Sequence, residues 1–126
     1  MNFEYSHGLI WLNAGIQYEG RLINIDKCIL DTGSATTAIN IDLVNLNYQN
    51  PTKIKRLFGI GNGTQEVISQ KIDALILGEK FVENIDIEFG LFDSKLGING
   101  FIGNDILSKF KIEINFTTSV ITIMKS

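Results

Sequence analysis

The residues best suited to chemistry in this sequence are Asp31, Thr32, Gly33 and Ser34, which directly follow the apolar run 28–30. A strand that ends in a small, glycine-containing turn holds an acidic side chain at the end of a rigid element, as a catalytic group requires. Gly33 lets the backbone turn sharply and approach whatever the carboxylate binds, and the Thr32 and Ser34 hydroxyls can donate hydrogen bonds nearby. Asp31 is therefore the candidate catalytic acid.

The composition restricts the possible chemistry to carboxylates, hydroxyls and backbone amides. The sequence has one His, His7, and one Cys, Cys28. A Ser/His or Cys/His mechanism would use His7 as its base, and His7 lies in a polar N-terminal stretch with no motif around it. One Cys forms no intrachain disulfide, and one His with one Cys cannot build a zinc cage within the chain. Cys28 is expected to be a small buried hydrophobic residue.

Length and charge restrict the architecture and the partners. The chain has 126 residues, is 44% hydrophobic, and carries 11 Lys and Arg against 14 Asp and Glu, for a net charge of -3. We expect a single domain, 1–126. The charge leaves no basic footprint for nucleic acid or an anionic membrane. No signal peptide or membrane-length apolar run is visible, so we predict a cytoplasmic protein with neither partner.

The elements that must position Asp31 are mostly strands. Residues 84–89 and 111–116 alternate polar and apolar side chains, as strands do, and the second run is expected to pair with residues 120–124 as a closing hairpin. Shorter apolar runs bounded by glycines or polar residues predict the remaining strands, at 9–12, 21–25, 27–30, 73–77 and 81–82.

Helical spacing is confined to two places. Ile102, Ile106 and Phe110 fall at i, i+4 and i+8, which predicts a short C-terminal helix. A weaker helical turn is expected over residues 41–46, with Asn40 as its cap. The fold class is therefore all-β, with about one short helix.

Several side chains are assigned to structure rather than to chemistry. Asp86, Glu88 and Glu113 alternate with apolar residues, which predicts solvated strand faces. Trp11 and Phe101 are more often core residues than cleft residues, and we expect both in the core.

Three motifs resemble the retropepsin-like aspartic proteases, and most closely the single-domain cellular and bacterial relatives of retroviral proteases. The resemblance runs from about Gly8 to Met124 and matches the order and approximate spacing of the motifs. The motifs are the Asp31-Thr32-Gly33-Ser34 turn, the glycine-rich run Phe58-Gly59-Ile60-Gly61-Asn62-Gly63, and the run 100–107 before the terminal hairpin.

The resemblance implies an aspartic endopeptidase with the acid protease barrel. Each chain of a homodimer would supply one Asp, and the two carboxylates would together hold a water that attacks a polypeptide substrate. Two carboxyl groups about 3 Å apart cannot both ionise cheaply, so the pair shares a proton, one acting as general base and the other as general acid. No metal, His or cofactor is needed by such a mechanism.

By position, the resemblance also implies roles for the neighbouring residues. Thr32 would hydrogen-bond across the dimer beneath the carboxylates, Gly33 would present its backbone to water or substrate, and Ser34 would support the turn. Asp105, in the third motif, would be structural rather than a second catalytic acid. The tip of a β-hairpin flap over the substrate would consist of Gly59, Ile60, Gly61, Asn62 and Gly63, unless this is an ordinary glycine-rich hairpin.

Two alternatives stay open from the sequence. The chain could be a non-catalytic peptide-binding or dimerisation module that keeps the protease fold, because a fold does not guarantee activity. It could also be a monomer in which Asp31 pairs with another acid of the same chain. The stretches before Asp31 and over 42–58 depart from the retroviral pattern, so the family's dimer interface is not transferred and stays unidentified.

Overall fold

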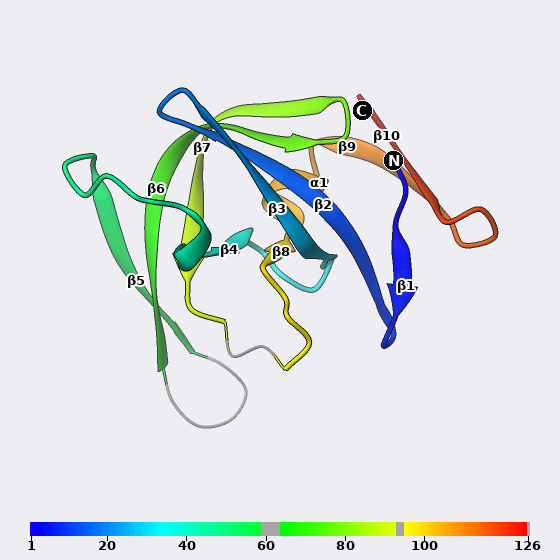
Figure 1. The fold of residues 1–126 in the computed structure, drawn as a ribbon, viewed down its shortest axis with the longest axis horizontal. Coiled ribbons are helices and arrows are strands. Elements are labelled where there is room, and N and C mark those ends of the chain that lie inside the picture. Colours follow the sequence, from blue (N-terminus) through cyan, green and yellow to red (C-terminus); the bar gives the residue numbers. More distant parts are fainter. Residues whose placement is uncertain (59–63, 93–94, 126) are drawn as a thin grey trace.

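The computed structural model describes residues 1–58, 64–92 and 95–125 (Figure 1). It is built mainly of strands, with one 3-10 turn and one short α-helix in the described ranges. In chain order the elements are β1 (Glu4–Ser6), β2 (Leu9–Tyr18), β3 (Arg21–Leu30), β4 (Ala38–Asn40), η1 (Ile41–Leu43), β5 (Thr52–Phe58), β6 (Thr64–Leu77), β7 (Lys80–Gly90), β8 (Gly100–Ile102), α1 (Asn104–Leu107), β9 (Phe110–Asn115) and β10 (Val120–Lys125).

Eight strands form one sheet that closes on itself. Their order is β1-β2-β3-β8-β4-β7-β6-β5, and β2 also pairs with β6 through Gly15, Ile16 and Gln17. This additional pairing joins two distant positions of the sheet into a barrel, with β1 and β5 left as edges. The all-β barrel with a short C-terminal helix is therefore confirmed.

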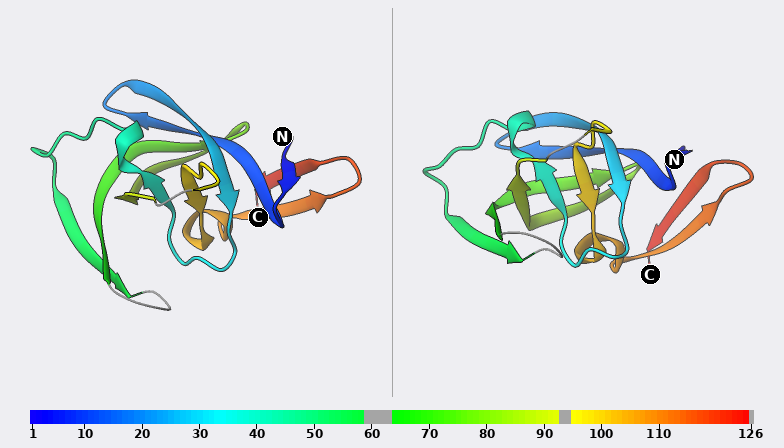
Figure 2. Two further views of the ribbon diagram at one scale, coloured as in Figure 1. Left: turned by 60° about the horizontal axis from the view of Figure 1, so that its bottom comes forward. Right: turned by 90° about the horizontal axis from the view of Figure 1, so that it is seen from below.

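The C-terminal hairpin lies outside this sheet. Strands β9 and β10 form a two-stranded sheet of their own, and they project to one side of the barrel (Figures 1 and 2). The N-terminus joins them, because the Met1 ammonium donates to the Ile121 carbonyl at 2.8 Å and Asn2 bridges to Val120. The two ends of the chain therefore stabilise each other.

The core lies between the curved faces of the sheet and beneath α1. Its largest completely buried side chains include Ile16, Ile39, Phe89 and Ile106, each with 0% exposure. The predicted strand at 84–89 belongs to β7, where the alternation gives way to a fully buried end at residues 87–90. The predicted strands 73–77 and 81–82 belong to β6 and β7, which a turn at residues 78–79 joins, with Gly78 at φ 59°.

The helix predictions are corrected in extent. Only Asn104–Leu107 is α-helical, whereas Ile102 ends β8 and Phe110 begins β9. The three apolar side chains at helical spacing therefore reach the core from three different elements. The predicted turn over 41–46 is a 3-10 turn at Ile41–Leu43, capped as expected by the Asn40 side chain, which accepts from the Asp42 amide at 3.1 Å.

The strand predictions before Asp31 are also corrected. The runs 21–25 and 27–30 form one continuous strand, β3, that passes through Lys27 at φ 54°.

In the described part of the chain, no helix is long and apolar enough to cross a membrane.

Candidate active site

Asp31 is the first residue beyond β3, and two neighbouring strands fix its backbone. Leu30 pairs in parallel with Ile102 on β8, and the Asp31 amide continues that ladder by donating to the Ile102 carbonyl at 2.9 Å. Cys28, three residues earlier, is completely buried and belongs to the hydrophobic core, so the strand enters the turn from a packed interior. The Asp31 side chain is half-buried at the end of this rigid element.

The turn is closed by the Asp31 carboxylate itself. The Asp31 Oδ1 atom accepts a hydrogen bond from the Gly33 amide at 3.0 Å, and the Asp31 backbone carbonyl accepts one from the Ser34 amide at 3.3 Å. A Cβ atom at Gly33 would lie 3.2 Å from Oδ1, closer than most side-chain contacts allow. Among the residues that the structure describes, no group donates to Oδ2, which keeps its capacity to bind water or a second acid.

The remaining residues of the turn are held by α1. The Thr32 carbonyl accepts from the Asn104 side chain at 2.7 Å, and the Ser34 carbonyl accepts from the Asn104 amide at 2.8 Å. The Ser34 hydroxyl donates to the Thr36 carbonyl at 2.8 Å, so this side chain braces the loop from within. Thr32 is exposed, and its predicted hydrogen bond across a dimer stays a prediction.

A glycine allows α1 to pack directly against this loop. A Cβ atom at Gly103 would lie 2.6 Å from the Thr36 carbonyl oxygen and 2.8 Å from that of Ser34. Such distances are shorter than any real Cβ contact, and the obstacles are backbone atoms that cannot rotate away. Gly103 is therefore required for the contact between the helix and the Asp31 loop.

Asp105 has a structural position. Its two carboxylate oxygens accept from the Thr37 amide at 3.0 Å and from the Thr37 hydroxyl at 2.7 Å. The same hydroxyl accepts from the Gly103 amide at 3.0 Å, and Thr37 is completely buried. Asp105 thus fastens the end of the Asp31 loop to α1, which leaves its carboxylate committed to Thr37.

Sequence reasoning missed two residues at this site, Thr37 and Glu88. Thr37 gave no signal beyond its polar type. Glu88 was predicted on a solvated strand face, and that prediction is wrong, because Glu88 is 4% exposed and its carboxylate accepts from the Thr36 hydroxyl at 2.9 Å. Asp86 and Glu113 are exposed, as expected.

Cys28 lies in β3, three residues before Asp31, and is completely buried. Burial raises the pKa of its thiol to about 12, against an ordinary value of 9.0; the nearby Asp26 charge raises it further, and a hydrogen bond with the Ala14 backbone opposes the rise. The thiol is therefore protonated near neutral pH and is a poor nucleophile. The burial of Cys28 is as predicted.

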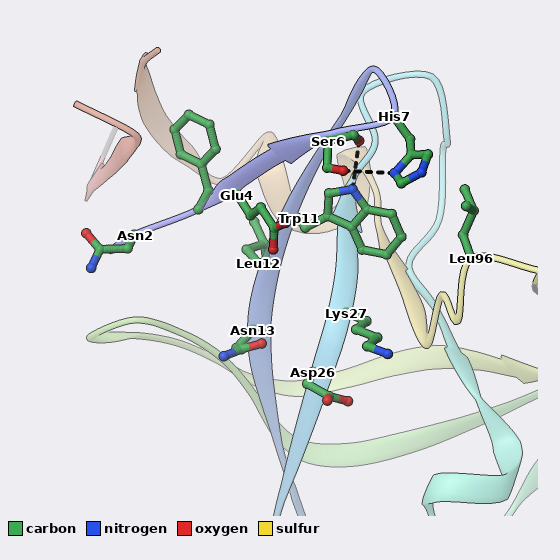
Figure 3. Close-up of a pocket in the computed structure, with 11 residues that line it drawn as sticks. Asn2, Glu4, Ser6, His7, Trp11, Leu12, Asn13, Asp26, Lys27 and Leu96 are labelled. Atoms are coloured by element: carbon green, nitrogen blue, oxygen red, sulfur yellow. Dashed lines mark hydrogen bonds between the residues drawn. The ribbon is translucent and has the colours of Figure 1, made fainter. Parts of the chain in front are cut away.

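Trp11 and Phe101 are outside the buried core, contrary to expectation. Trp11 lines a surface pocket of about 520 Å³ between the β1–β2 turn and the loop at Leu96 (Figure 3). Phe101 is half-exposed and packs edge-to-face on Phe92, with ring centroids 5.4 Å apart. Both residues lie in strands, β2 and β8, but their side chains lie on faces that the rest of the chain covers only in part.

His7 lines the same pocket as Trp11, in the turn after β1. The His7 Nδ1 atom lies 2.8 Å from the Ser6 hydroxyl, and Trp11 donates to the Ser6 carbonyl (Figure 3). A nucleophilic Ser/His pair needs a third group that orients the base. No carboxylate in the described part of the chain hydrogen-bonds to His7, so this pair lacks such a group.

The predicted flap residues, Gly59, Ile60, Gly61, Asn62 and Gly63, lie outside the described residues. The strands on either side of them are described: β5 pairs antiparallel with β6, from Thr52 opposite Gln70 to Phe58 opposite Thr64. The flap assignment stays a prediction.

Two comparisons with known proteins agree with this geometry. The family model described as "Retroviral aspartyl protease" matches residues 8–115. The crystal structure of a retropepsin-like aspartic protease from Rickettsia conorii is similar, with a TM-score of 0.67 and 20% sequence identity over 98% of this chain and 88% of that one. No curated protein sequence matches the chain. The family model covers both the Asp31 loop and α1, and the structural likeness confirms the predicted fold.

Proposed function

The chain belongs to the retroviral aspartyl protease family, and from this premise we propose that it is an aspartic endopeptidase that works as a homodimer. The observation that carries the proposal is the position of Asp31. It extends a buried strand, is braced by α1, and has one carboxylate oxygen without a donor among the described residues.

The homodimer supplies the second acid that the chemistry needs. The sequence has one Asp-Thr-Gly turn in its 126 residues. A partner within the same chain has no support in the described structure, where no other carboxylate hydrogen-bonds to Asp31 and Asp105 is committed to Thr37. A second copy brings an identical Asp31 to the two-fold axis.

In this mechanism the two Asp31 carboxyl groups share one proton and hold one water. The ionised member removes a proton from the water as the water oxygen attacks the peptide carbonyl carbon. The protonated member donates to the carbonyl oxygen, which gives a neutral tetrahedral diol. Proton transfer to the amide nitrogen then breaks the C–N bond and releases the two products. The Gly33 amide fixes the orientation of Asp31 throughout.

An extended polypeptide with apolar side chains fits the surface beside Asp31. Ile29 pairs with Phe101, and Phe101 pairs with Ala38, so these three side chains lie on one face of the sheet. Asp31 follows Ile29 by two residues and continues that face. The half-exposed Phe101 and its contact with Phe92 provide an apolar surface on which a substrate side chain can pack.

The substitution Asp31→Asn tests the proposal. The amide keeps the shape of the side chain and an oxygen that accepts from Gly33, but it removes the shared proton, so we expect at least about a thousandfold loss of peptide cleavage. Cleavage of a diverse peptide library by the purified protein, from about pH 4 to about pH 7, is the measurement. Wild-type rates in the variant would refute the assignment. Binding of peptides by the wild-type protein without any cleavage would favour a non-catalytic peptide-binding module.

A further inference from the structure

Glu88 is a buried carboxylate that the proposed mechanism does not use. It lies in β7, and its side chain is 5% exposed. Removing a carboxylate from water costs several kcal/mol in general, and the cost is offset only by hydrogen bonds and opposite charge. The contacts of Glu88 therefore indicate what the residue does.

Glu88 lies on the same face of the sheet as Asp31. It pairs with Ala38, Ala38 pairs with Phe101, and Phe101 pairs with Ile29. Directly paired residues share a face, so this row runs across β7, β4, β8 and β3 on the side where Asp31 follows. Glu88 is thus at the far end of the surface proposed for the substrate.

One set of contacts joins Glu88 to the catalytic loop. The Thr36 hydroxyl donates to Glu88 Oε2 at 2.9 Å, and the Glu88 amide donates to the Thr37 carbonyl at 3.2 Å. The Thr36 carbonyl in turn accepts from the Ser34 hydroxyl. The carboxylate therefore holds the end of the loop opposite to Asp31.

A second contact joins Glu88 to the β5–β6 hairpin. Lys55 Nζ lies 3.6 Å from Glu88 Oε1, and Lys55 is on β5, which is an edge strand paired with β6 in the described sheet. Lys55 is opposite Val67 on β6, and Glu88 is opposite Ser69, two residues further along the same face. The lysine side chain therefore crosses β6 to reach the carboxylate.

We propose that Glu88 is a positioning residue that couples the β5–β6 hairpin to the Asp31 loop. This inference rests on the proposed function, because the loop is taken to be catalytic and because Lys55 on β5 shares the face that is proposed to bind the substrate. The hydrogen bond from Thr36 to a buried charge is the stronger link. The ion pair is weaker, because the Lys55 side chain is 46% exposed.

The two links predict different kinetic effects. Thr36→Val removes the donor on the catalytic loop and lowers kcat about tenfold with little change in KM, because small misplacement of a catalytic group is costly. Lys55→Met keeps the length of the side chain but removes its charge, and raises KM about threefold with little change in kcat. Glu88→Gln weakens both links and changes both constants. Adding Lys55→Met to Glu88→Gln raises KM no further, since the charge pair is already absent.

Glu113→Gln is the matched control. Glu113 also lies 3.6 Å from a lysine, Lys111, but both side chains are more than 60% exposed on β9, at 62% and 66%. The control substitution removes one carboxylate charge from an ion pair with the same N–O distance, but at a site away from the loop. We expect its kcat and KM to equal those of the wild type.

Amide hydrogen exchange separates this inference from the proposed function. Glu88→Gln is expected to speed exchange both in β5 and at the loop amides of Ser34 and Asp31, compared with Glu113→Gln, whether or not the protein cleaves peptides. An active wild type with Glu88→Gln indistinguishable from Glu113→Gln in kcat, KM and exchange would overturn the inference. A lower melting temperature with unchanged kinetics per folded molecule would also overturn it, because Glu88 would then be structural only. An inactive wild type with the expected exchange pattern would overturn the proposed function but support the coupling.

Discussion

At the scale of single residues, the chemistry of the site depends on what surrounds each carboxylate rather than on the carboxylate itself. Asp31 has a backbone fixed by β8, one oxygen bound by Gly33 and a second without a donor in the described structure. Asp105 has its oxygens bound by Thr37. Only the first arrangement leaves a group free to hold water.

The pattern of residues identified Asp31 but not Glu88, for a physical reason. The Asp31 turn is a local structure, set by a strand, an acid and a nearby glycine. Asp86 and Glu88 are two residues apart in β7 and share a face, yet the first is exposed and the second buried. Alternation determines which face a side chain joins, whereas the contacts that cover the face, here Thr36 and Lys55, come from distant parts of the chain.

The buried Cys28 thiol predicts a pH dependence of stability. Its pKa is about 12 in the folded protein, against 9.0 for an ordinary thiol. The folded state therefore keeps the proton to higher pH, and the stability that this provides is complete below about pH 9 and is lost as the pH rises toward 12. The free energy of unfolding of the wild type should fall by about 1 kcal/mol relative to Cys28→Ala between about pH 8.5 and about pH 10.

Urea unfolding of both proteins across this range is the measurement. The comparison with Cys28→Ala cancels the titration of lysines and tyrosines that both proteins share. A difference between the two proteins that stays constant with pH would contradict the burial of the thiol in the folded state.

At the scale of elements, the site is a loop held between β3, β8 and α1. The strands at 84–89 and 111–116 were predictable, because their polar and apolar side chains alternate regularly. The strand at 120–124 was predictable because it is β-branched and a short turn separates it from 111–116. The longer helix was predicted wrongly. The side chains of Ile102, Ile106 and Phe110 pack against the same core, but they come from β8, α1 and β9. The spacing of apolar residues predicts which side chains are buried, but it does not predict which element carries each of them.

Gly103→Ala tests the packing of α1 on the Asp31 loop. The new Cβ would meet the Thr36 carbonyl at 2.6 Å, so the helix or the loop must shift, and we expect a loss of about 1–3 kcal/mol in the free energy of unfolding together with reduced peptide cleavage. Gly15→Ala is the control, because its Cβ would lie 3.4 Å from the Ile76 side chain, in near-ordinary contact. Equal stability of the two variants in chemical denaturation would show that the close approach at Gly103 is not required.

At the scale of the whole molecule, a barrel with one Asp31 is half of the proposed catalyst. The hairpin of β9 and β10 projects from the barrel beside β1 (Figure 2). Aromatic contacts join the two, since Phe116 packs edge-to-face on both Phe3 and Tyr5. Tyr5 and Phe116 remain 60% and 57% exposed. Because the chain has one candidate catalytic acid and the proposed reaction needs two, the sequence predicts a homodimer. The number of acids does not identify the dimer interface.

Mixing wild-type protein with the Asp31→Asn variant tests the central claim most directly, that two chains contribute one Asp31 each. At a total concentration where the dimer is complete and subunits exchange, a mixed dimer has one carboxylate and is expected to be inactive. Peptide cleavage per wild-type chain, measured as the variant is added at constant total concentration, should therefore fall in proportion to the wild-type fraction. Cleavage per wild-type chain that stays constant at every ratio would contradict the account, because each chain would then be a complete catalyst.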